Sequence, residues 1–289
     1  NDFTRQGALR FSEDGKVFLA ENKNNSIPPL INLPDLLYAS EKFLEKNETA
    51  RDLKLLLTPG SSLGGARPKA SIIDKDGSLA IAKFPRKDDE LDIVSWEAVA
   101  LKLAQMAKIT TVTFRLEKIS NKPVLIIKRF DRLNNNGRIP FISAMSILNA
   151  TDNDSIQYSY MDIVYSIMEY GANPKEDLEE LWKRMVFNIV INNTDNHLRN
   201  HGFIYRRNMG WTLSPAYDLN PSLDKLIFAT AIDDSGTNNT IEKAVKLAKE
   251  FRLSDKKVNK ILKDINEAII NWKNVAKAFG INNSEIIRM

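Results

Sequence analysis

The chain has 289 residues, of which 43% are hydrophobic and 27% charged, the balance of an ordinary globular protein. It contains no cysteine, which excludes disulfides and cysteine metal sites and agrees with a reducing cytoplasm. The net charge of +4 is too small to argue for nucleic acid, and we find neither a membrane-spanning apolar run nor a signal segment, so we expect no membrane association.

The chain begins with patterns that favour short strands followed by helices. Two β-like runs, at 7–11 and 17–19, flank an Asp14-Gly15 turn signal and predict a hairpin. Helical spacing of apolar residues then predicts a helix over 36–44 and a shorter one over 51–57.

A segment rich in glycine and serine, 58–69, comes next. Glycine lets the backbone approach a phosphate closely, and successive N–H groups can form an anion-binding nest. Gly60 and Gly65 have the spacing of a Walker A loop, but Ala66 stands where that motif requires lysine, so this is not a P-loop. A plain Gly-Ser turn is the alternative interpretation.

Two strands, over 70–73 and 79–82, should form a hairpin. Lys83 ends the second strand, where protein kinases keep a phosphate-binding lysine, although lysines are also common at ordinary strand ends. A helix predicted over 90–106 carries Glu97, the kind of acid that pairs with that lysine in kinases. A solvated surface glutamate is the alternative.

Two further strands are predicted over 111–116 and 124–130. The second runs into Lys128-Arg129-Phe130-Asp131-Arg132. A strand that leads from an N-lobe into a C-lobe is the hinge of a kinase, whose backbone binds adenine. Lys128 and Phe130 are therefore candidate nucleotide-binding residues.

The second half of the chain is predicted to be mainly helical. Helices are expected over 158–170, 173–189, 241–251 and 254–272. The last two have lysine-rich outer faces, which we interpret as solvated. A hairpin formed by 203–205 and 211–213 should bring Asp218 back beside Asn200.

The stretch Asn193-Thr194-Asp195-Asn196-His197-Leu198-Arg199-Asn200 is dense in acid, amide and imidazole groups. Asp195 and Asn200 have the D-x-x-x-x-N spacing of a kinase catalytic loop, in which the aspartate accepts the substrate hydroxyl proton and the asparagine holds Mg²⁺. Asp218 follows where a kinase keeps its other metal-binding aspartate. Taken alone, this spacing is common by chance.

The order of these signals predicts an α+β fold of the bilobal protein-kinase type. A β-rich N-lobe, 1–130, would carry the Gly/Ser-rich loop and the hinge strand, and a mainly helical C-lobe, 131–289, would carry the catalytic loop. The chemistry would be transfer of the ATP γ-phosphoryl group, with Mg²⁺ and cations spreading its charge. Asn200 and Asp218 offer the oxygen ligands that Mg²⁺ prefers.

Five motifs spread over nearly the whole chain resemble the HipA toxin kinase family. They are Ser61-Ser62-Leu63-Gly64-Gly65-Ala66-Arg67-Pro68-Lys69-Ala70, Ala82-Lys83-Phe84-Pro85, Lys128-Arg129-Phe130-Asp131-Arg132, Asn193-Thr194-Asp195-Asn196-His197-Leu198-Arg199-Asn200 and Leu213-Ser214-Pro215-Ala216-Tyr217-Asp218. The resemblance implies a bacterial, cytoplasmic Ser/Thr kinase toxin that phosphorylates an aminoacyl-tRNA synthetase and so stops translation and growth. It also implies a HipB-like helix-turn-helix antitoxin, through which operator DNA is bound only indirectly.

The resemblance also implies residue roles. Asp195 is the catalytic base, Asn200 and Asp218 bind Mg²⁺, and Ser62, with Ser61 as second candidate, is autophosphorylated. The nucleotide-binding positions are Ser62, Leu63, Gly64, Gly65, Ala66, Lys69, Lys83, Lys128, Phe130 and His197. Phosphate on Ser62 would add negative charge that competes with ATP for the loop, so the product should be inactive.

Long members of the family carry an extra subdomain ahead of the Gly-Ala-Leu-Arg-Phe segment, which begins here at Gly7. This beginning resembles the short, HipT-like toxins, whose missing subdomain is a separate small protein, HipS. A trimmed chain would look the same.

Two other functions are compatible with parts of the sequence. His197 and His201 stand at i, i+4, which on one helix could place both on the metal of a hydrolase. Leu198 replaces the glutamate of H-E-x-x-H and Arg199 would repel a dication, so we prefer His197 as a hydrogen-bonding residue of the loop. The non-catalytic alternative is a corepressor that binds an antitoxin and DNA through the lysine-rich tail.

Overall fold

The computed structural model describes residues 4–19, 32–49, 52, 67–133, 137–151, 158–223 and 227–289. The chain forms two compact units, Asn1–Ala98 with Thr113–Pro140, and Val99–Val112 with Phe141–Met289. This division differs from the predicted one at residue 130. The helix α3 (Ile93–Met106) starts in the first unit and ends in the second without a linker, so no change in composition marks the crossing.

The first unit is built on a four-stranded antiparallel sheet. Its strands are β1 (Lys69–Ile73), β2 (Leu79–Lys83), β3 (Phe114–Ile119) and β4 (Lys122–Lys128), in the order β1-β2-β4-β3. The β1–β2 turn contains Gly77 at φ +76°, a conformation that glycine adopts without strain. All four strands were predicted. The strand β3 begins later than expected because the Val112 N–H donates to the Ala216 carbonyl and not to a strand of this sheet.

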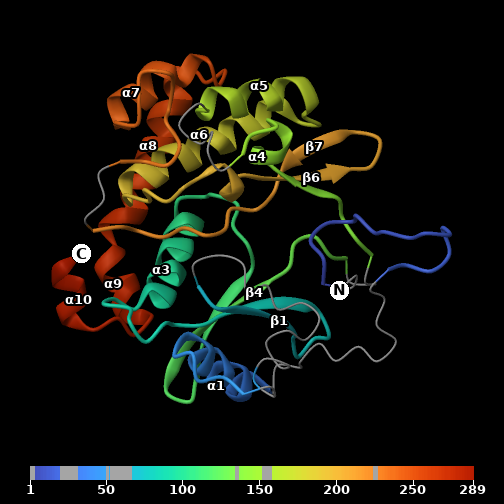
Figure 1. Cartoon of the computed structure of the whole chain (residues 1–289). Helices are drawn as coiled ribbons and strands as arrows, with labels where there is room; N and C mark the ends of the chain where they lie inside the picture. Colours follow the sequence, from blue (N-terminus) through green and yellow to red (C-terminus); the bar gives the residue numbers. More distant parts are fainter. Residues whose placement is uncertain are drawn as a thin grey trace. The chain divides into compact units, whose positions relative to one another are not determined.

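The helix α1 (Leu33–Leu44) covers one face of this sheet (Figure 1). Leu33, Leu36 and Leu37 pack against alternate strand residues, including Ala80 and Ala82 of β2. Because side chains alternate along a strand, Lys83 lies on the opposite face of the sheet. The predicted helix over 51–57 lies, apart from Asp52, outside the described residues.

The segment near the N-terminus forms a loop in place of the predicted hairpin. A single antiparallel bridge joins Ser12 to Phe18, and Leu19 N–H donates to the Phe11 carbonyl at 2.7 Å. The Asp14-Gly15 signal thus predicted the turn correctly but not the strands on either side of it, which are too short to form a ladder.

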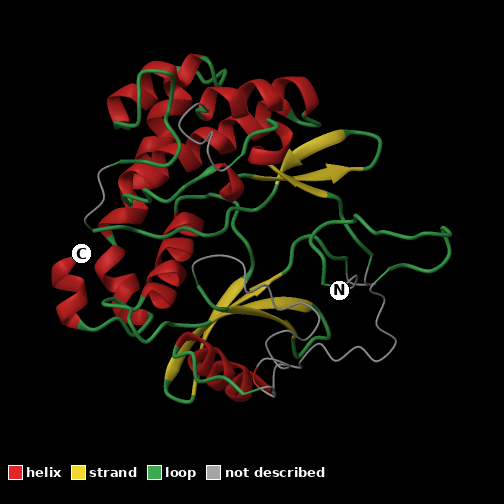
Figure 2. Cartoon of the chain, viewed as in Figure 1, coloured by secondary structure: helices red, strands yellow, loops and turns green. Residues whose placement is uncertain are grey.

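The second unit is mainly helical (Figure 2). Its helices are α4 (Ala144–Ile147), α5 (Tyr160–Tyr170), α6 (Pro174–Val190), α7 (Ile241–Lys246), α8 (Asp255–Ile270), α9 (Trp272–Ala278) and α10 (Asn283–Arg288), with 3₁₀ turns η3 (Leu198–Asn200) and η4 (Leu247–Lys249). A three-stranded antiparallel sheet orders β5 (Phe141–Ser143), β6 (Gly202–Arg206) and β7 (Gly210–Leu213) as β5-β6-β7. The last predicted helix ends early, because Asn271 separates α8 from α9.

The helix α6 forms the centre of this unit. Proline at its first position and Glu176 in its first turn favour its start, since an acid complements the positive end of the helix dipole. Leu178, Trp182 and Met185 are fully buried, as predicted. In the described part of the chain, no helix combines the length and apolarity needed to cross a membrane.

Candidate active site

Lys83 and Glu97 form a buried ion pair within the first unit. The Lys83 ammonium donates to both carboxylate oxygens of Glu97, at 2.7 and 2.8 Å. The two side chains are only 15% and 4% exposed. Water therefore screens the pair weakly, and removing one partner would leave a buried charge. The strand lysine and the helix acid thus have the arrangement that the kinase pattern predicts.

A second lysine lies beside this pair. Lys69 is the direct cross-strand partner of Lys83 in the register of β1 with β2, so both side chains project from the sheet face opposite α1. Two neighbouring ammonium groups on one face are suited to phosphate oxygens. The other loop positions predicted to contact nucleotide or to be phosphorylated, Ser61, Ser62, Leu63, Gly64, Gly65 and Ala66, lie outside the described residues.

The polar contacts of Lys128 lie within the first unit. Its ammonium pairs with Asp76 at 2.9 Å, and its N–H donates to the Thr113 carbonyl at 2.9 Å. Phe130, two residues later, is half-buried. That these two residues bind nucleotide stays a prediction.

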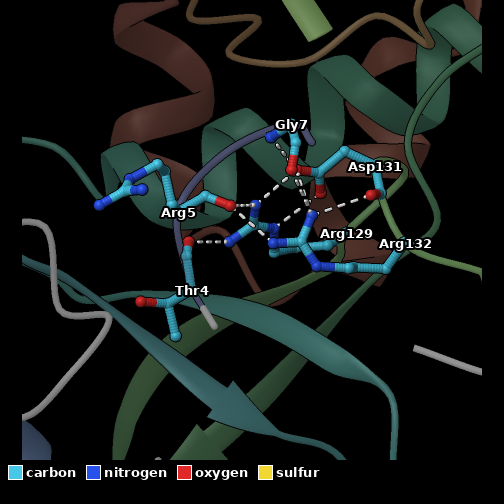
Figure 3. Close-up of polar contacts among 6 residues, drawn as sticks. All are labelled: Thr4, Arg5, Gly7, Arg129, Asp131 and Arg132. Carbon is cyan, nitrogen blue, oxygen red and sulfur yellow. Dashed lines mark hydrogen bonds and ion pairs between the residues drawn. The ribbon is translucent and has the colours of Figure 1, made fainter. Parts of the chain in front are cut away.

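The residues that follow Lys128 form a buried ion cluster (Figure 3). Asp131 accepts hydrogen bonds from Arg129, Arg132 and the Gly7 N–H, the last at 2.7 Å. Arg129 also donates to the Thr4 carbonyl at 2.6 Å. Burial alone would raise the pKa of Asp131, but the two arginines hold it below its usual range. The motif thus anchors the segment 4–7 to the first unit.

The loop 193–200 follows the end of α6 in the second unit. Asn192 ends the helix at φ +51°, a left-handed conformation that asparagine tolerates. Asp195 is exposed, while its neighbours Thr194 and Asn196 are buried. Asn200 donates from its side chain to the Asp195 carbonyl at 3.2 Å. The loop therefore exposes Asp195 to solvent and ties the Asn200 side chain to the Asp195 backbone.

Asp218 lies on a backbone segment that contacts this loop. The Tyr217 hydroxyl donates to the Arg199 carbonyl at 2.7 Å. Two more hydrogen bonds fix the segment: Val112 N–H donates to the Ala216 carbonyl at 3.0 Å, and Ala216 N–H donates to the Thr110 carbonyl at 2.8 Å. Tyr217 and Arg199 are joined by the first of these hydrogen bonds, and the next residues in the sequence are Asp218 and Asn200. The β6–β7 hairpin formed as predicted, and the proximity of the Asp218 and Asn200 side chains stays a prediction.

The donor set near Asp218 fits Mg²⁺ better than zinc. Asp218 has φ +58°, a strained conformation for a residue with a side chain, of the kind concentrated at functional sites. Asn220 donates to Asp218 Oδ1 at 3.2 Å, and the buried Asn220 Oδ1 has no hydrogen-bond partner. Across the described residues, no group of three or more His, Cys, Asp or Glu side chains could hold a metal. One carboxylate with an amide oxygen suits Mg²⁺, which is commonly held by few protein ligands together with substrate phosphates.

The two histidines do not form a metal site. The 3₁₀ turn η3 separates them, so they do not share an α-helical face. His201 is buried and its Nε2 lies 3.0 Å from the side-chain nitrogen of Asn196, while burial lowers its pKa to about 3. His197 Nδ1 is buried and has no hydrogen-bond partner, so the side-chain bond predicted for it is not formed through this atom. That nitrogen could meet a ligand.

Sequence reasoning missed several polar residues of this region. Asn220 and Tyr217 contact the Asp218 segment, and Tyr160 and Asn188 lie beneath the loop. Tyr217 directly precedes Asp218 in the motif 213–218, and this position was its only signal in the sequence. No local pattern pointed to the other three.

Comparison with known proteins identifies the family of the chain. The HipA-like C-terminal domain model matches residues 61–272. The chain belongs to this family. It is 24% identical over 229 residues to a Haemophilus influenzae protein named "Putative kinase", covering 72% of this chain and 62% of that protein. It is also 24% identical over 181 residues to "Putative kinase Y4mE" of Sinorhizobium fredii, covering 55% of this chain and 41% of that protein. The chain thus spans less than two thirds of the length of these curated relatives.

Solved structures confirm the predicted fold class. The Shewanella oneidensis HipA, solved with HipB and operator DNA, superposes with a TM-score of 0.61 at 18% identity, covering 78% of this chain and 61% of that one. The Helicobacter pylori proinflammatory kinase CtkA gives a TM-score of 0.50 at 16% identity, covering 72% and 92%. The HipA-like domain therefore has an α+β, kinase-like fold.

Proposed function

We propose that this protein is an ATP-dependent protein kinase. The observation that carries the proposal is the loop 193–200, which exposes Asp195, ties Asn200 to it and contacts the segment of Asp218 through the Tyr217–Arg199 hydrogen bond. The buried Lys83–Glu97 pair supports it from the first unit. Kinases use residues of these types for base, metal and phosphate contacts.

In this mechanism, the Asp195 carboxylate accepts the proton of the substrate hydroxyl as its oxygen attacks the γ-phosphorus. Lys83, fixed by Glu97, offers its ammonium to the nucleotide phosphates, and Lys69 adds a second positive charge on the same sheet face. Asn200 and Asp218 would hold Mg²⁺, which neutralises charge on the transferring group when bound. The products are ADP and a phosphorylated hydroxyl.

We further propose that the substrate hydroxyl belongs to a serine or threonine of a protein, and that the kinase is a bacterial toxin. The family supports this, as does the structural neighbour, whose crystals contain HipA with HipB and operator DNA. The expected partner is a HipB-like antitoxin, and the expected target is an aminoacyl-tRNA synthetase whose modification stops translation. Autophosphorylation at Ser62, or at Ser61, would switch the enzyme off by placing negative charge in the nucleotide loop.

Ligand-dependent stabilisation tests the nucleotide and metal assignments. ATP with Mg²⁺ should raise the melting temperature much more than ATP with EDTA, because a ligand bound only by the native state stabilises it. Asp218→Ala should lose this difference, whereas Asp234→Ala, an exposed aspartate in the same unit, should keep it. Equal stabilisation with and without Mg²⁺ in the wild type would contradict the metal assignment.

Expression in cells tests the toxin assignment. Induction of the wild type should arrest growth and add phosphate to one or a few proteins, which phosphoproteomics identifies. Asp195→Asn should do neither. A modified protein other than a synthetase would correct the target and leave the kinase proposal intact, whereas arrest by the Asp195→Asn variant would favour the corepressor alternative.

A further inference from the structure

We infer that Tyr160 is a positioning residue for the catalytic loop, acting through Asn196, the neighbour of Asp195. The inference rests on the proposed kinase function and adds a part to it that the sequence motifs do not include. Tyr160 is the first residue of α5, is 2% exposed and lies 36 residues from Asn196 in the chain.

The Tyr160 hydroxyl is the shared acceptor of two buried amides. The side-chain nitrogen of Asn196 donates to it at 2.7 Å and that of Asn188 at 3.3 Å. Asn188 in turn accepts from the Asn193 side chain at 3.0 Å. Both ends of the loop segment that contains Asp195 are therefore connected to one hydroxyl group.

Asn196 uses both hydrogens of its amide nitrogen in this network. One points to Tyr160, and the other faces His201 Nε2 at 3.0 Å. His201 Nε2 must then act as an acceptor, which assigns its proton to Nδ1. With both hydrogens directed to fixed partners, the Asn196 side chain has one orientation.

The backbone on either side of Asp195 is fixed as well. The Thr230 hydroxyl donates to the Asn196 carbonyl at 2.7 Å, and the Ala229 N–H donates to the Thr194 carbonyl at 2.8 Å. Asp195 is exposed between these two anchored residues. A shift of Asn196 would pass to Asp195 through the peptide bond that joins them, and displacements of this kind reduce rates because proton transfer needs close alignment.

Removal of the hydroxyl should change little else. The backbone of Tyr160 is held by its own hydrogen bond to the Ala231 carbonyl at 2.9 Å, and Ser159 and Asp162 form a capping box at the start of α5. The Tyr160 ring also packs edge-on against the His201 ring, with centroids 5.1 Å apart. Tyr160→Phe keeps these contacts and leaves two buried N–H groups without their acceptor.

The test compares Tyr160→Phe with Tyr165→Phe, a change on the same helix at a tyrosine that is 60% exposed. With Mg²⁺-ATP, Tyr160→Phe should lower kcat by about tenfold with KM for ATP within about twofold, because ground-state nucleotide contacts are untouched. Tyr165→Phe should match the wild type in both constants. An unchanged kcat in a folded Tyr160→Phe would overturn the inference.

A double-mutant cycle adds a readout that a merely structural role would not produce. Asn196→Ala removes both donors and should lower kcat more than Tyr160→Phe. Because Tyr160 acts mainly through Asn196, the double variant should lose much less than the product of the two single losses. Losses that multiply would overturn the proposed route.

Hydrogen exchange separates this inference from the kinase proposal and does not depend on activity. Amides of 194–197 should exchange about tenfold faster in Tyr160→Phe than in Tyr165→Phe, since the opening free energy of the loop falls. If the wild type transfers no phosphate but Tyr160→Phe still loosens the loop, the kinase proposal is rejected and the anchoring of the loop is kept. Unchanged exchange would reject the anchoring, whatever the activity.

Discussion

The two units hold their candidate functional residues by different means. In the first, Lys83 is held by the opposite charge of Glu97. In the second, the neighbours of Asp195 are held by amides, a hydroxyl and a neutral imidazole, while Asp195 itself stays exposed. The difference follows from the chemistry proposed for each. A phosphate-binding lysine stays charged beside a carboxylate, whereas a base must keep its own charge uncompensated to accept a proton.

The largest effect on the rate of phosphoryl transfer should come from removing the positive charge of Lys83 in the Lys83–Glu97 pair. Lys83→Met keeps the length of the side chain but removes the ammonium, so phosphoryl transfer should fall by about 10²-fold or more, as loss of a charged transition-state contact does. The matched control is Lys118→Met, since that lysine also lies on a strand of this sheet, β3, but is exposed and has no role in the proposed site. Steady-state rates decide between them, and equal losses in both variants would contradict the distinct role of Lys83.

Breaking the pair from the other side should be seen in stability. Glu97→Leu leaves the Lys83 ammonium buried without its carboxylate, which should reduce the free energy of unfolding by about 3 kcal/mol. The double variant Lys83→Met with Glu97→Leu should recover most of that loss, because an apolar pair can replace a buried ion pair. Urea denaturation measures both, and a double variant as unstable as Glu97→Leu would show that packing, not charge, causes the loss.

The neutral network should respond to acid. Burial lowers the pKa of His201 to about 3, below its unfolded value near 6.5. The unfolded chain therefore binds a proton that the native state does not, so the stability contributed by neutral His201 is complete above about pH 6.5 and is lost on acidification at up to about 1.4 kcal/mol per pH unit. Between pH 7 and 5, wild type should lose about 2 kcal/mol more than His201→Gln in urea denaturation. Parallel losses in the two proteins would contradict a buried neutral His201.

The smallest effect concerns a carboxylate outside the proposed chemistry. Asp177 accepts from the Thr212 hydroxyl and the Leu213 N–H through Oδ1, while its buried Oδ2 has no hydrogen-bond partner. Burial raises the pKa of Asp177, so its ionisation opposes folding as the pH rises above its unfolded value. Asp177→Asn keeps the acceptor without the charge and should stabilise the protein by up to about 1 kcal/mol near pH 7, with a smaller gain near pH 4. Destabilisation by Asp177→Asn, measured by urea denaturation at both values, would contradict this assignment.

Local patterns predicted the parts of the fold that local signals determine. The β1–β2 and β6–β7 hairpins have turn residues between β-prone runs, and both formed as expected. The strand β5 is only three residues long and pairs with β6, which lies far from it in the sequence. Its pattern is therefore too short to predict a strand. The sequence also does not predict that α3 passes from one unit to the other, because the helical pattern continues without a break at that point.

The candidate site also contains residues that local sequence patterns indicate and contacts that only the folded chain brings together. Asp195, Asn200 and Asp218 were proposed from spacing within one short region, and the Lys83–Glu97 pair from its order along the chain. The contact of Asp131 with Gly7 spans 124 residues and that of Asn196 with Tyr160 spans 36, so only the folded chain brings these groups together. Asparagine and tyrosine are also common in ordinary helices and loops, so their types alone give no signal.

The most direct test of the account is transfer of radiolabelled phosphate from ATP by wild type, Asp195→Asn and Asp255→Asn in the presence of Mg²⁺. Asp195→Asn keeps the shape of the loop but removes the base, so label transferred to protein should fall by at least ~10²-fold. Asp255 is exposed at the start of α8, away from the loop in sequence, and its variant should transfer label at the wild-type rate. A folded Asp195→Asn protein that transfers label as fast as the wild type would contradict the kinase assignment of this loop.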